Sequence, residues 1–375
     1  MNSDLSNSNW RRPATMVFAA AAVASCVAAS PKVADSRTAP PVYRPAPYQA
    51  PPRYQVVVPV PPATPRPMSA PQALVTNIAA LGRSFNGRVG IAVRSVDNGW
   101  SVQTNGDALL PQQSVSKLWV AMTVLDFRDA GKLRLEDPVT LKPEDLTLFH
   151  QPIAALIKAD GYQTTIGALL QRALTMSDNT ANDRLLRYVG GPKAVRAFIQ
   201  RKQLGDIRFG PGERLLQSAT AGLAWKPEYA FGNAFTRARA RLPQTDRIAA
   251  FERYVTDPPD GAAPMAIAGA LMKLKRGELL SASSTEYLIG TMQSSKTGKM
   301  RLRGAVPEGW SFGHKTGTGQ DLAGRTAGYN DVGLLTAPDG KSYALAVMIG
   351  DTPRPIPDRQ ALMQAVVAAV VVNHH

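Results

Sequence analysis

The chain has 375 residues, 44% of them apolar, and a formal net charge of +15 at pH 7. This length and apolar content allow one large domain or two ordinary ones with a sizeable core. A single cysteine, Cys26, excludes an internal disulfide, a cysteine-rich metal site and a cysteine nucleophile in the folded part. No basic helix with interleaved aromatic residues is visible, so a nucleic-acid partner is not expected, and the basic surface favours anionic material of the cell envelope.

Residues 1–25 are typical of an export signal. A pair of arginines precedes an apolar, alanine-rich stretch, Ala14–Ser25, which is too short to span a bilayer stably. The small residues before Cys26 resemble the lipobox of bacterial lipoproteins, in which the cysteine is lipidated and becomes the mature N-terminus. An ordinary signal peptide with an incidental cysteine is the alternative. Both interpretations predict an exported protein, and the first predicts a periplasmic lipoprotein held at the membrane through Cys26.

Residues 26–71 form a proline-rich segment. Between positions 31 and 71 lie 13 of the 30 prolines of the chain. Such a segment lacks donors for helix or sheet and favours the extended polyproline II conformation. The sequence therefore predicts a tether between the lipidated Cys26 and a folded domain over 72–375. A proline-rich ligand for a partner protein is the alternative.

The folded part starts with a helical pattern over 72–84 and a hairpin whose strands are 88–96 and 100–103. A long apolar helix then runs from about Ser114 to Ala130 and stops at Gly131. Helices are also predicted at 165–176, 192–203, 264–276 and 282–294, strands at 309–315, 325–336 and 342–350, and a closing helix at 357–372. This order predicts an α/β fold, in which an antiparallel sheet assembled from both chain ends is flanked by helices and carries an inserted all-α lobe.

The first chemical motif is Ser114-Val115-Ser116-Lys117. Its serine and lysine are three residues apart, so on a helix they lie on one face. An amine beside a serine hydroxyl can accept or relay its proton, and a helix N-terminus favours the developing anion. The alternative is a helix cap followed by a surface lysine, but the apolar helix that follows predicts a half-buried Lys117.

Two further motifs follow along the chain. The triplet 177–179, Ser-Asp-Asn, is common in turns, but a loop serine can pass a proton to a leaving nitrogen, and the Asn179 amide can hold a substrate amide. The stretch 315–319, Lys-Thr-Gly-Thr-Gly, lies on a predicted strand. There the glycines would let a substrate approach the strand edge, and the lysine and hydroxyls would bind a carboxylate. A second Lys-Thr-Gly at 296–298 is interpreted as the capped end of a helix.

In this order the three motifs form the signature of the penicillin-recognising serine enzymes. The stretches Leu174–Ala181, Gly190–Lys193 and Gly277–Leu280 resemble the class A β-lactamases in particular, and the resemblance covers most of 72–375. It implies the fold of β-lactamases and D,D-peptidases. It also implies a monomeric serine hydrolase that opens β-lactam amides through an acyl-enzyme on Ser114, with Lys117 and Ser177 moving protons and no metal or cofactor.

The resemblance also gives Glu213 a role. This residue lies 36 positions after Ser177 and 21 after Pro192, which is the class A spacing for the Ω-loop glutamate. In that family the glutamate is the base that activates water to hydrolyse the acyl-enzyme, and D,D-peptidases with the same three motifs lack it. A glutamate in a surface loop is the alternative.

The loop departs from the family at several positions. Gln217 stands where the family has the asparagine that holds the water, and Asp183 stands where an asparagine braces the glutamate. Pro211 replaces an arginine that clamps the loop to an acidic partner, here Asp260. An insertion over about 218–257, rich in arginines and aromatic residues, follows. The floor of the site is therefore expected to be rebuilt, with slow deacylation or an unusual substrate as the consequence.

Further roles come from the resemblance alone. The backbone N–H groups of Ser114 and Thr318 would form the oxyanion hole. Substrate binding would involve Asn179 and Gln217, together with the Lys315, Thr316 and Gly317 of the strand motif. Arg325 would bind the substrate carboxylate, since the family has an arginine nearby.

Phe149 resembles the aromatic residue that walls the entrance of the site, with an ordinary core residue as the alternative. His150 and His314 lie near the motifs but are not needed for this chemistry, so both are expected to be structural. Two other functions stay open at this point. One is a D,D-peptidase or esterase acting on peptidoglycan-like peptides, and the other is a penicillin-binding sensor that acylates and then deacylates slowly.

Overall fold

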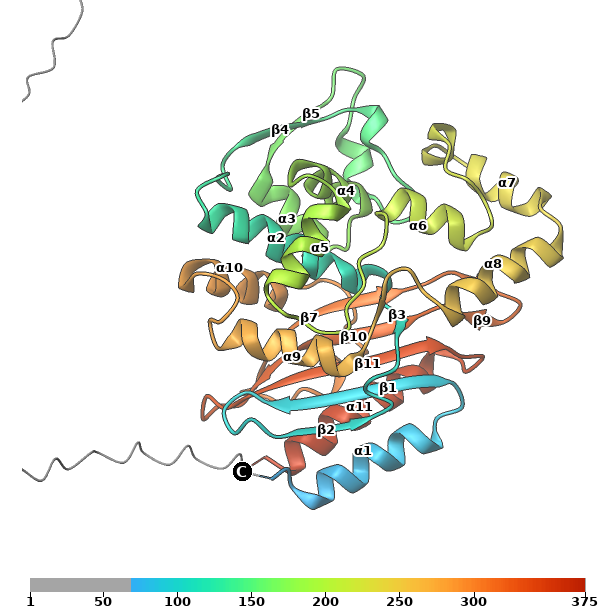
Figure 1. The fold of residues 1–375 in the computed structure, drawn as a ribbon. Helices are drawn as coiled ribbons and strands as arrows, with labels where there is room; N and C mark the ends of the chain where they lie inside the picture. Colours follow the sequence, from blue (N-terminus) through green and yellow to red (C-terminus); the bar gives the residue numbers. More distant parts are fainter. Residues whose placement is uncertain (1–68, 375) are drawn as a thin grey trace, which may run out of the picture. The chain divides into compact units, whose positions relative to one another are not determined.

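A five-stranded antiparallel sheet lies at the centre of the computed structural model, which describes residues 69–374 (Figure 1). The strand order is β2-β1-β11-β10-β7, so the first two strands of the chain pair with the last three. The prediction that both chain ends build one sheet is therefore confirmed. The strands of this sheet are β1 (Arg88–Ser95), β2 (Ser101–Thr104), β7 (Ser311–Thr318), β10 (Tyr329–Thr336) and β11 (Ser342–Asp351).

Three short antiparallel pairs complete the strands of the described residues. They are β3 (Leu110–Pro111) with β6 (Gly261–Ala262), β4 (Pro138–Leu141) with β5 (Tyr162–Thr165), and β8 (Asp321–Leu322) with β9 (Arg325–Thr326). The β3–β6 pair comes just before Ser114 and joins the chain there to a segment about 150 residues later, which fixes the start of the serine motif.

Helices cover both faces of the sheet. α1 (Gln72–Ser84) and α11 (Ile356–Val372) lie on one face, where Leu74 and Val366 pack with the sheet's Val347 into an apolar core (Figure 1). The other face carries a larger apolar core and most of the remaining helices. These are α2 (Lys117–Asp129), α3 (Ile166–Thr175), α4 (Asn179–Tyr188), α5 (Pro192–Arg201), α9 (Pro264–Lys275) and α10 (Ala282–Gln293).

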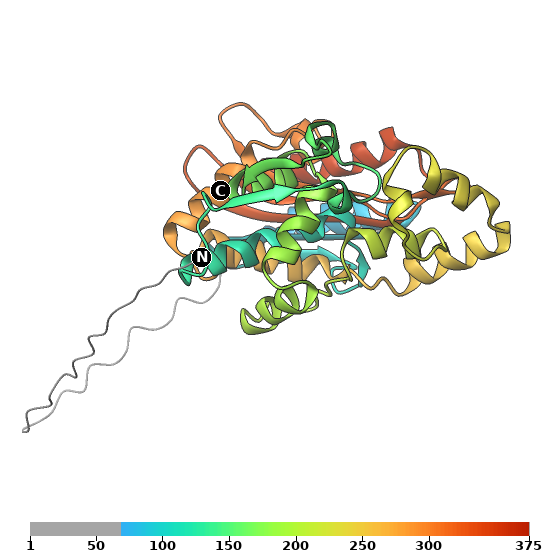
Figure 2. The same cartoon turned by 90° about the horizontal axis from the view of Figure 1, so that it is seen from above.

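The expected insertion, about 218–257, contains two helices of its own, α7 (Ala234–Arg241) and α8 (Gln244–Thr256). They follow α6 (Glu213–Thr220), which starts before the insertion. The two yellow helices, α7 and α8, lie at one end of the helical layer, beyond α6, in both views (Figures 1 and 2). An aromatic contact joins α7 to the loop that carries Phe149, because Phe235 of α7 packs edge-on against Phe149 with ring centroids 5.1 Å apart.

Most predicted elements are confirmed to within a few residues, and the differences have physical causes. The serine motif forms a 3₁₀ turn, Gln113–Ser116, and the regular helix starts only at Lys117. Helix α4 has no counterpart among the predicted elements, because its sequence is mostly polar and its start is set by the Asp178 side chain, which accepts the Ala181 N–H at 3.0 Å. No helix within residues 69–374 is long and apolar enough to cross a membrane. Cys26 and the predicted signal segment, 1–25, lie outside the described residues, as does most of the proline-rich segment.

Candidate active site

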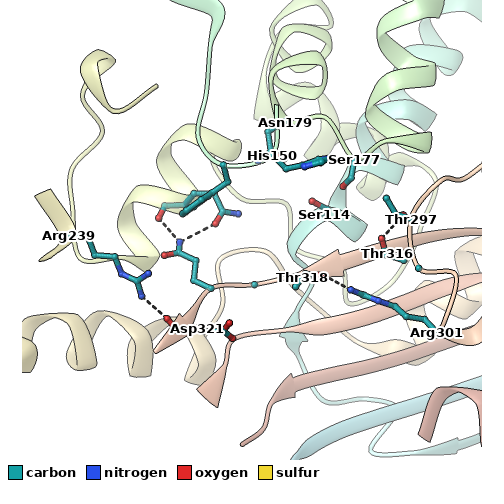
Figure 3. A pocket seen from close by; sticks show the side chains of 15 residues that line it. Ser114, His150, Ser177, Asn179, Arg239, Thr297, Arg301, Thr316, Thr318 and Asp321 are labelled. Atoms are coloured by element: carbon teal, nitrogen blue, oxygen red, sulfur yellow. Dashed lines mark hydrogen bonds between the residues drawn. The ribbon is translucent and has the colours of Figure 1, made fainter. Parts of the chain in front are cut away.

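A pocket opens where the edge strand β7 meets the helical layer (Figure 3). Its volume is about 570 Å³, which is within the usual range for a small-molecule site. Seven residues singled out from the sequence line it: Ser114, Phe149, Ser177, Asn179, Gln217, Thr316 and Thr318. Residues from five separate parts of the chain therefore converge here, as the order of the three motifs predicts.

The serine turn brings a hydroxyl and an amine together. The Lys117 Nζ donates a hydrogen bond to the Ser114 Oγ at 2.8 Å, and the lysine side chain is fully buried. On its other side the same Nζ forms an ion pair with the carboxylate of Glu213. Gln113, just before the serine, has a φ of +54°, a conformation that non-glycine residues adopt rarely and mostly at functional sites. The turn thus holds Ser114 beside a lysine that can move its proton.

A second lysine and serine face each other across the pocket. The Lys315 Nζ donates to the Ser177 Oγ at 2.9 Å and to the Thr316 carbonyl at 2.8 Å. Burial, followed by the positive charges of Lys117 and Arg301, lowers the pKa of Lys315 well below its ordinary value. Ser177 itself has a φ of +58°. A proton shared between this lysine and serine is therefore easily passed on, which suits delivery to a leaving group.

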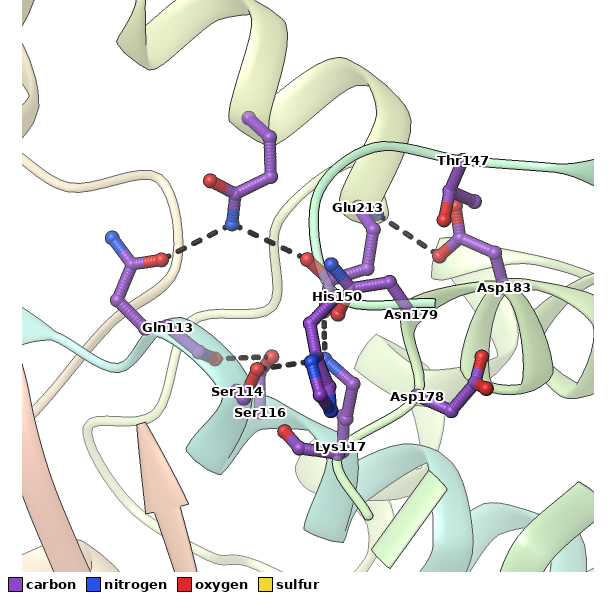
Figure 4. A network of polar contacts seen from close by, with 12 residues as sticks. Gln113, Ser114, Ser116, Lys117, Thr147, His150, Asp178, Asn179, Asp183 and Glu213 are labelled. Carbon is purple, nitrogen blue, oxygen red and sulfur yellow. Dashed lines mark hydrogen bonds and ion pairs between the residues drawn. The ribbon is translucent and has the colours of Figure 1, made fainter. Parts of the chain in front are cut away.

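Glu213 is the first residue of α6 and is only 4% exposed (Figure 4). Its backbone N–H donates to the Asp183 carboxylate at 3.0 Å, so Asp183 braces the loop although the family has an asparagine there. The Gln217 Nε2 donates to the Glu213 Oε2 at 3.3 Å and to the Gln113 Oε1 at 3.1 Å. Glu213 therefore touches the general-base candidate Lys117 on one side and a pocket-lining amide on the other.

The carboxyl of Asp183 is itself perturbed. Burial and the nearby charge of Glu213 raise its pKa to about 6 from the ordinary 3.8. A carboxyl whose pKa is higher in the folded protein stabilises the fold fully only below its unfolded pKa. This stability is lost as the pH rises through about 6, where the folded carboxyl ionises.

Replacing Asp183 by asparagine is therefore expected to stabilise the protein at neutral pH. The amide keeps an oxygen for the Glu213 N–H, gives up the longer bond that the second oxygen accepts from the Arg214 N–H at 3.3 Å, and removes the buried charge. The unfolding free energy should rise by about 2 kcal/mol at pH 8 and change little at pH 4, as measured by urea unfolding. The exposed Asp206→Asn variant is the control and should show no pH-dependent difference. An equal change at both pH values would contradict the charge-burial explanation.

The insertion rebuilds the floor behind the serine turn. The Asp260 carboxylate accepts the Gln113 N–H at 2.8 Å and the hydroxyl of Tyr254, on α8, at 3.2 Å. The Gln113 Nε2 in turn donates to the Tyr254 oxygen at 2.7 Å. Burial raises the pKa of Asp260 to about 6. Tyr254, from the insertion, thus contacts Asp260, the acidic residue that the family's arginine was expected to pair with. The same tyrosine also bonds to Gln113, the residue before Ser114.

Five predicted site residues are absent from the pocket lining, and three of them, Lys117, Glu213 and Lys315, contact lining residues from behind. The other two, Arg325 and Gly317, have different contacts. Arg325 is absent from the pocket lining, because its guanidinium is held by the carboxylates of Asp351 and Glu252. Gly317 does not line the pocket either. A Cβ at this position would lie 2.4 Å from the Gln112 carbonyl oxygen, so the glycine lets strand β7 approach the serine turn rather than the substrate.

The second Lys-Thr-Gly, at 296–298, is more than the end of a helix. α10 already ends at Gln293, and both Thr297 and Gly298 line the pocket. The Thr297 and Thr316 hydroxyls lie 2.9 Å apart, so the two Lys-Thr-Gly segments meet at one end of the site. Interpreting 296–298 only as a helix cap was therefore wrong.

Arg301, which is not among the predicted site residues, lines the same end of the pocket. Its guanidinium donates to the Thr318 Oγ1 at 2.5 Å and to the Gly317 carbonyl at 2.9 Å. The signal that could have found it is its spacing, four residues after Thr297. Arg301 rather than Arg325 is the arginine beside the strand motif.

The two histidines differ in position. His150 lines the pocket, and its Nε2 donates to the Met176 carbonyl at 2.8 Å, which ties the Phe149 loop to the Ser177 loop. His314 is fully buried behind β7, 2.8 Å from the Asp331 carboxylate. Within residues 69–374 there is no group of three or more histidine, cysteine or acidic residues that could hold a metal ion.

Comparisons with known proteins agree with this geometry. Residues 73–374 match the model of the β-lactamase enzyme family. The chain is 30% identical to the extended-spectrum β-lactamase PER-1 of Pseudomonas aeruginosa over 70% of this chain and 75% of that protein. It is 26% identical to the β-lactamase VEB-1 of the same organism, over 74% of this chain and 83% of that protein.

Solved structures give the same result. A β-lactamase from Chitinophaga pinensis matches with a TM-score of 0.63 and 27% identity, covering 81% of this chain and 99% of that one. An ancestral class A β-lactamase matches with a TM-score of 0.62 and 30% identity, covering 80% of this chain and 99% of that one. The predicted fold is therefore confirmed, and the chain belongs to the β-lactamase enzyme family as a class A serine hydrolase acting on β-lactams.

Proposed function

We propose that this enzyme hydrolyses β-lactams through an ester on Ser114 that Glu213 helps to cleave. The observation that carries the proposal is the position of the Lys117 amine, which contacts the Ser114 hydroxyl at 2.8 Å and the Glu213 carboxylate on its other side. Because this amine donates to both groups, it would give one of its protons to the Glu213 carboxylate as it takes the proton of the Ser114 hydroxyl. The serine oxygen could then attack the lactam carbonyl, with the proton held on Glu213.

The remaining side chains fit the other parts of the reaction. Negative charge that develops on the carbonyl oxygen would be held by the backbone N–H groups of Ser114 and Thr318, each donor contributing about 3 kcal/mol in such sites. Ser177, which accepts a hydrogen bond from Lys315, would pass a proton to the lactam nitrogen as the C–N bond breaks. Asn179 would hold the amide of the acyl side chain.

The substrate carboxylate would bind at the end of the pocket where Thr316 and Arg301 lie. Two observations support this position for the carboxylate. The guanidinium of Arg301 donates to the Thr318 hydroxyl, and the hydroxyls of Thr297 and Thr316 lie next to each other at the same end. Lys315 lies behind them and donates to the Ser177 hydroxyl and the Thr316 carbonyl. Arg325 has no part in this proposal, since Asp351 and Glu252 already neutralise it.

Water attack on the ester would be assisted by Glu213. Gln217, whose Nε2 contacts the glutamate at 3.3 Å and which lines the pocket, would hold the attacking water in place of the family's asparagine. The glutamate would take the proton of the water, and the ester bond to Ser114 would break with return of a proton to the serine.

The experiment for this function is steady-state turnover of a chromogenic cephalosporin by the purified chain. Sustained hydrolysis, with many products per enzyme, is the expected result. A single stoichiometric burst that leaves a stable adduct would indicate the penicillin-binding sensor instead. Release of terminal D-alanine from peptides, without any reaction with the cephalosporin, would indicate a D,D-peptidase.

We also propose that the enzyme is exported, acts as a monomer in the periplasm and is anchored to the membrane by a lipid on Cys26. The support lies in the sequence, where small residues precede the single cysteine and a proline-rich segment follows it.

The Cys26→Ala variant is expected to move the enzyme from the membrane fraction to the soluble periplasmic fraction of the producing cell. A single cysteine makes the comparison simple, because no other residue could carry a thioether-linked lipid. Fractionation followed by immunoblotting measures the shift. Wild-type enzyme already in the soluble fraction would contradict the lipid anchor.

A further inference from the structure

Arg239 brings a positive charge to the end of the pocket opposite Arg301. It belongs to α7 of the insertion, is half-buried, and lines the pocket beside Gln320 and Asp321 (Figure 3). One of its terminal nitrogens donates to the Asp321 backbone carbonyl at 2.9 Å. This single bond holds the guanidinium in place and leaves several of its five N–H donors for another group.

The charge of Arg239 is not neutralised within the described part of the chain. No carboxylate among residues 69–374 forms an ion pair with Arg239. In contrast, Arg325, on strand β9, forms ion pairs with two carboxylates. The Asp321 carboxylate is already bonded to the Thr326 hydroxyl. Burial lowers the pKa of Arg239 most, the positive charge of Arg247 lowers it further, and the nearby Asp321 carboxylate raises it by less. Two arginines thus stand against one carboxylate here, so this end of the pocket carries a net positive charge.

The position of Arg239 relative to Ser114 suggests what it would meet. In Figure 3, Ser114 lies between Arg239 and Asp321 at one end of the pocket and Arg301 and Thr316 at the other. A β-lactam whose ring carboxylate binds at the Arg301 end and whose carbonyl lies over Ser114 must extend its acyl substituent toward the Arg239 end.

We propose that Arg239 forms an anion-binding subsite, so that the enzyme prefers β-lactams with a carboxylate on the acyl side chain. This inference rests on the proposed hydrolysis at Ser114. A guanidinium presents parallel N–H groups that fit a carboxylate, and such charge-assisted bonds are stronger than neutral ones. Partial burial of Arg239 strengthens the attraction relative to a fully exposed arginine.

Two penicillins that differ by one group provide the test. Benzylpenicillin and its α-carboxy analogue, carbenicillin, share the ring carboxylate and the aromatic side chain. The Arg239→Gln variant is expected to lose about 10-fold in kcat/KM for carbenicillin and less than 2-fold for benzylpenicillin, because charge-assisted bonds of this kind correspond to roughly that factor. The loss should fall mainly on KM and should shrink at high salt.

Arg237→Gln is the matched control. Arg237 lies on the same helix, is exposed and does not line the pocket. Two helical positions correspond to about 200°, so its side chain leaves the opposite face of α7. This variant removes the same charge and should leave the ratio of kcat/KM for the two penicillins unchanged. Thermal unfolding checks that both variants are folded, since Arg239 makes only one described hydrogen bond through its side chain.

The outcomes separate the subsite from the function. If Arg239→Gln lowers kcat/KM equally for both penicillins, or if Arg237→Gln changes the ratio as much, the anion-binding subsite is contradicted and the proposed hydrolysis still stands. If wild-type enzyme hydrolyses neither penicillin and forms no Ser114 adduct with them, the proposed function itself fails, and the subsite with it.

Discussion

Replacing Glu213 by glutamine is expected to leave the enzyme acylated on Ser114. The amide keeps the shape of the side chain and its contact with Gln217, but it cannot take a proton from water. General-base catalysis of this kind contributes about 10²- to 10⁴-fold, so deacylation should slow by roughly 10³-fold. Turnover of a chromogenic cephalosporin would then fall, and intact-protein mass spectrometry would find most of the enzyme carrying the opened β-lactam.

The control is Glu228→Gln, an exposed glutamate within the insertion, which should keep wild-type turnover. A Glu213→Gln variant that hydrolyses the cephalosporin at the wild-type rate would show that another group activates the water. A variant that forms no adduct at all would show that the ester cannot be made without the contact of Glu213 with Lys117. Either result contradicts the expected accumulation of acylated enzyme.

Replacing Ser114 by alanine has the largest expected effect, since no ester can then form. The kcat/KM for any β-lactam should fall by about 10⁴-fold or more, as in other serine hydrolases that lose their nucleophile. Ser116→Ala is the matched control. Its hydroxyl donates to the Gln113 carbonyl at 2.7 Å, so the variant should lose about 1 kcal/mol of stability while keeping a reactive Ser114.

Stopped-flow kinetics on both serine variants measures this difference. Substantial turnover by Ser114→Ala would exclude the proposed nucleophile. A loss in Ser116→Ala as large as that in Ser114→Ala would mean that the geometry of the turn, rather than one hydroxyl, determines the rate.

Most of the predictable parts of the site share one property, which is that the functional group lies within a short local motif; Glu213 is the exception, since its role was predicted from its spacing to Ser177 and Pro192. Ser114 with Lys117, the Ser177 loop and the strand with Lys315 are recognisable because three to five consecutive residues carry the chemistry. The fold was predictable for a similar reason, since alternation marks β1 and continuous apolar runs mark β11 and α11.

The residues that escaped prediction depend on contacts between distant segments. Tyr254 accepts a hydrogen bond from Gln113, 141 positions earlier in the chain. The composition of α8, which carries Tyr254, is ordinary and does not indicate that contact. Gly317 resembles a substrate-facing glycine until the neighbouring Gln112 carbonyl is seen. The sequence does not distinguish the environments of Arg239 and Arg325. Only the folded chain reveals that Arg325 has carboxylate partners and that Arg239 lines the pocket.

The most direct test of the central claim follows the wild-type enzyme through one turnover. Enzyme mixed with a β-lactam is quenched in acid at intervals, and peptide mass spectrometry measures the fraction that carries the opened β-lactam on Ser114. We expect an adduct on Ser114 alone, which forms at least as fast as kcat and decays fast enough to sustain turnover at kcat. Steady turnover without that adduct, or an adduct that persists while hydrolysis continues, would contradict an ester on Ser114 as the intermediate.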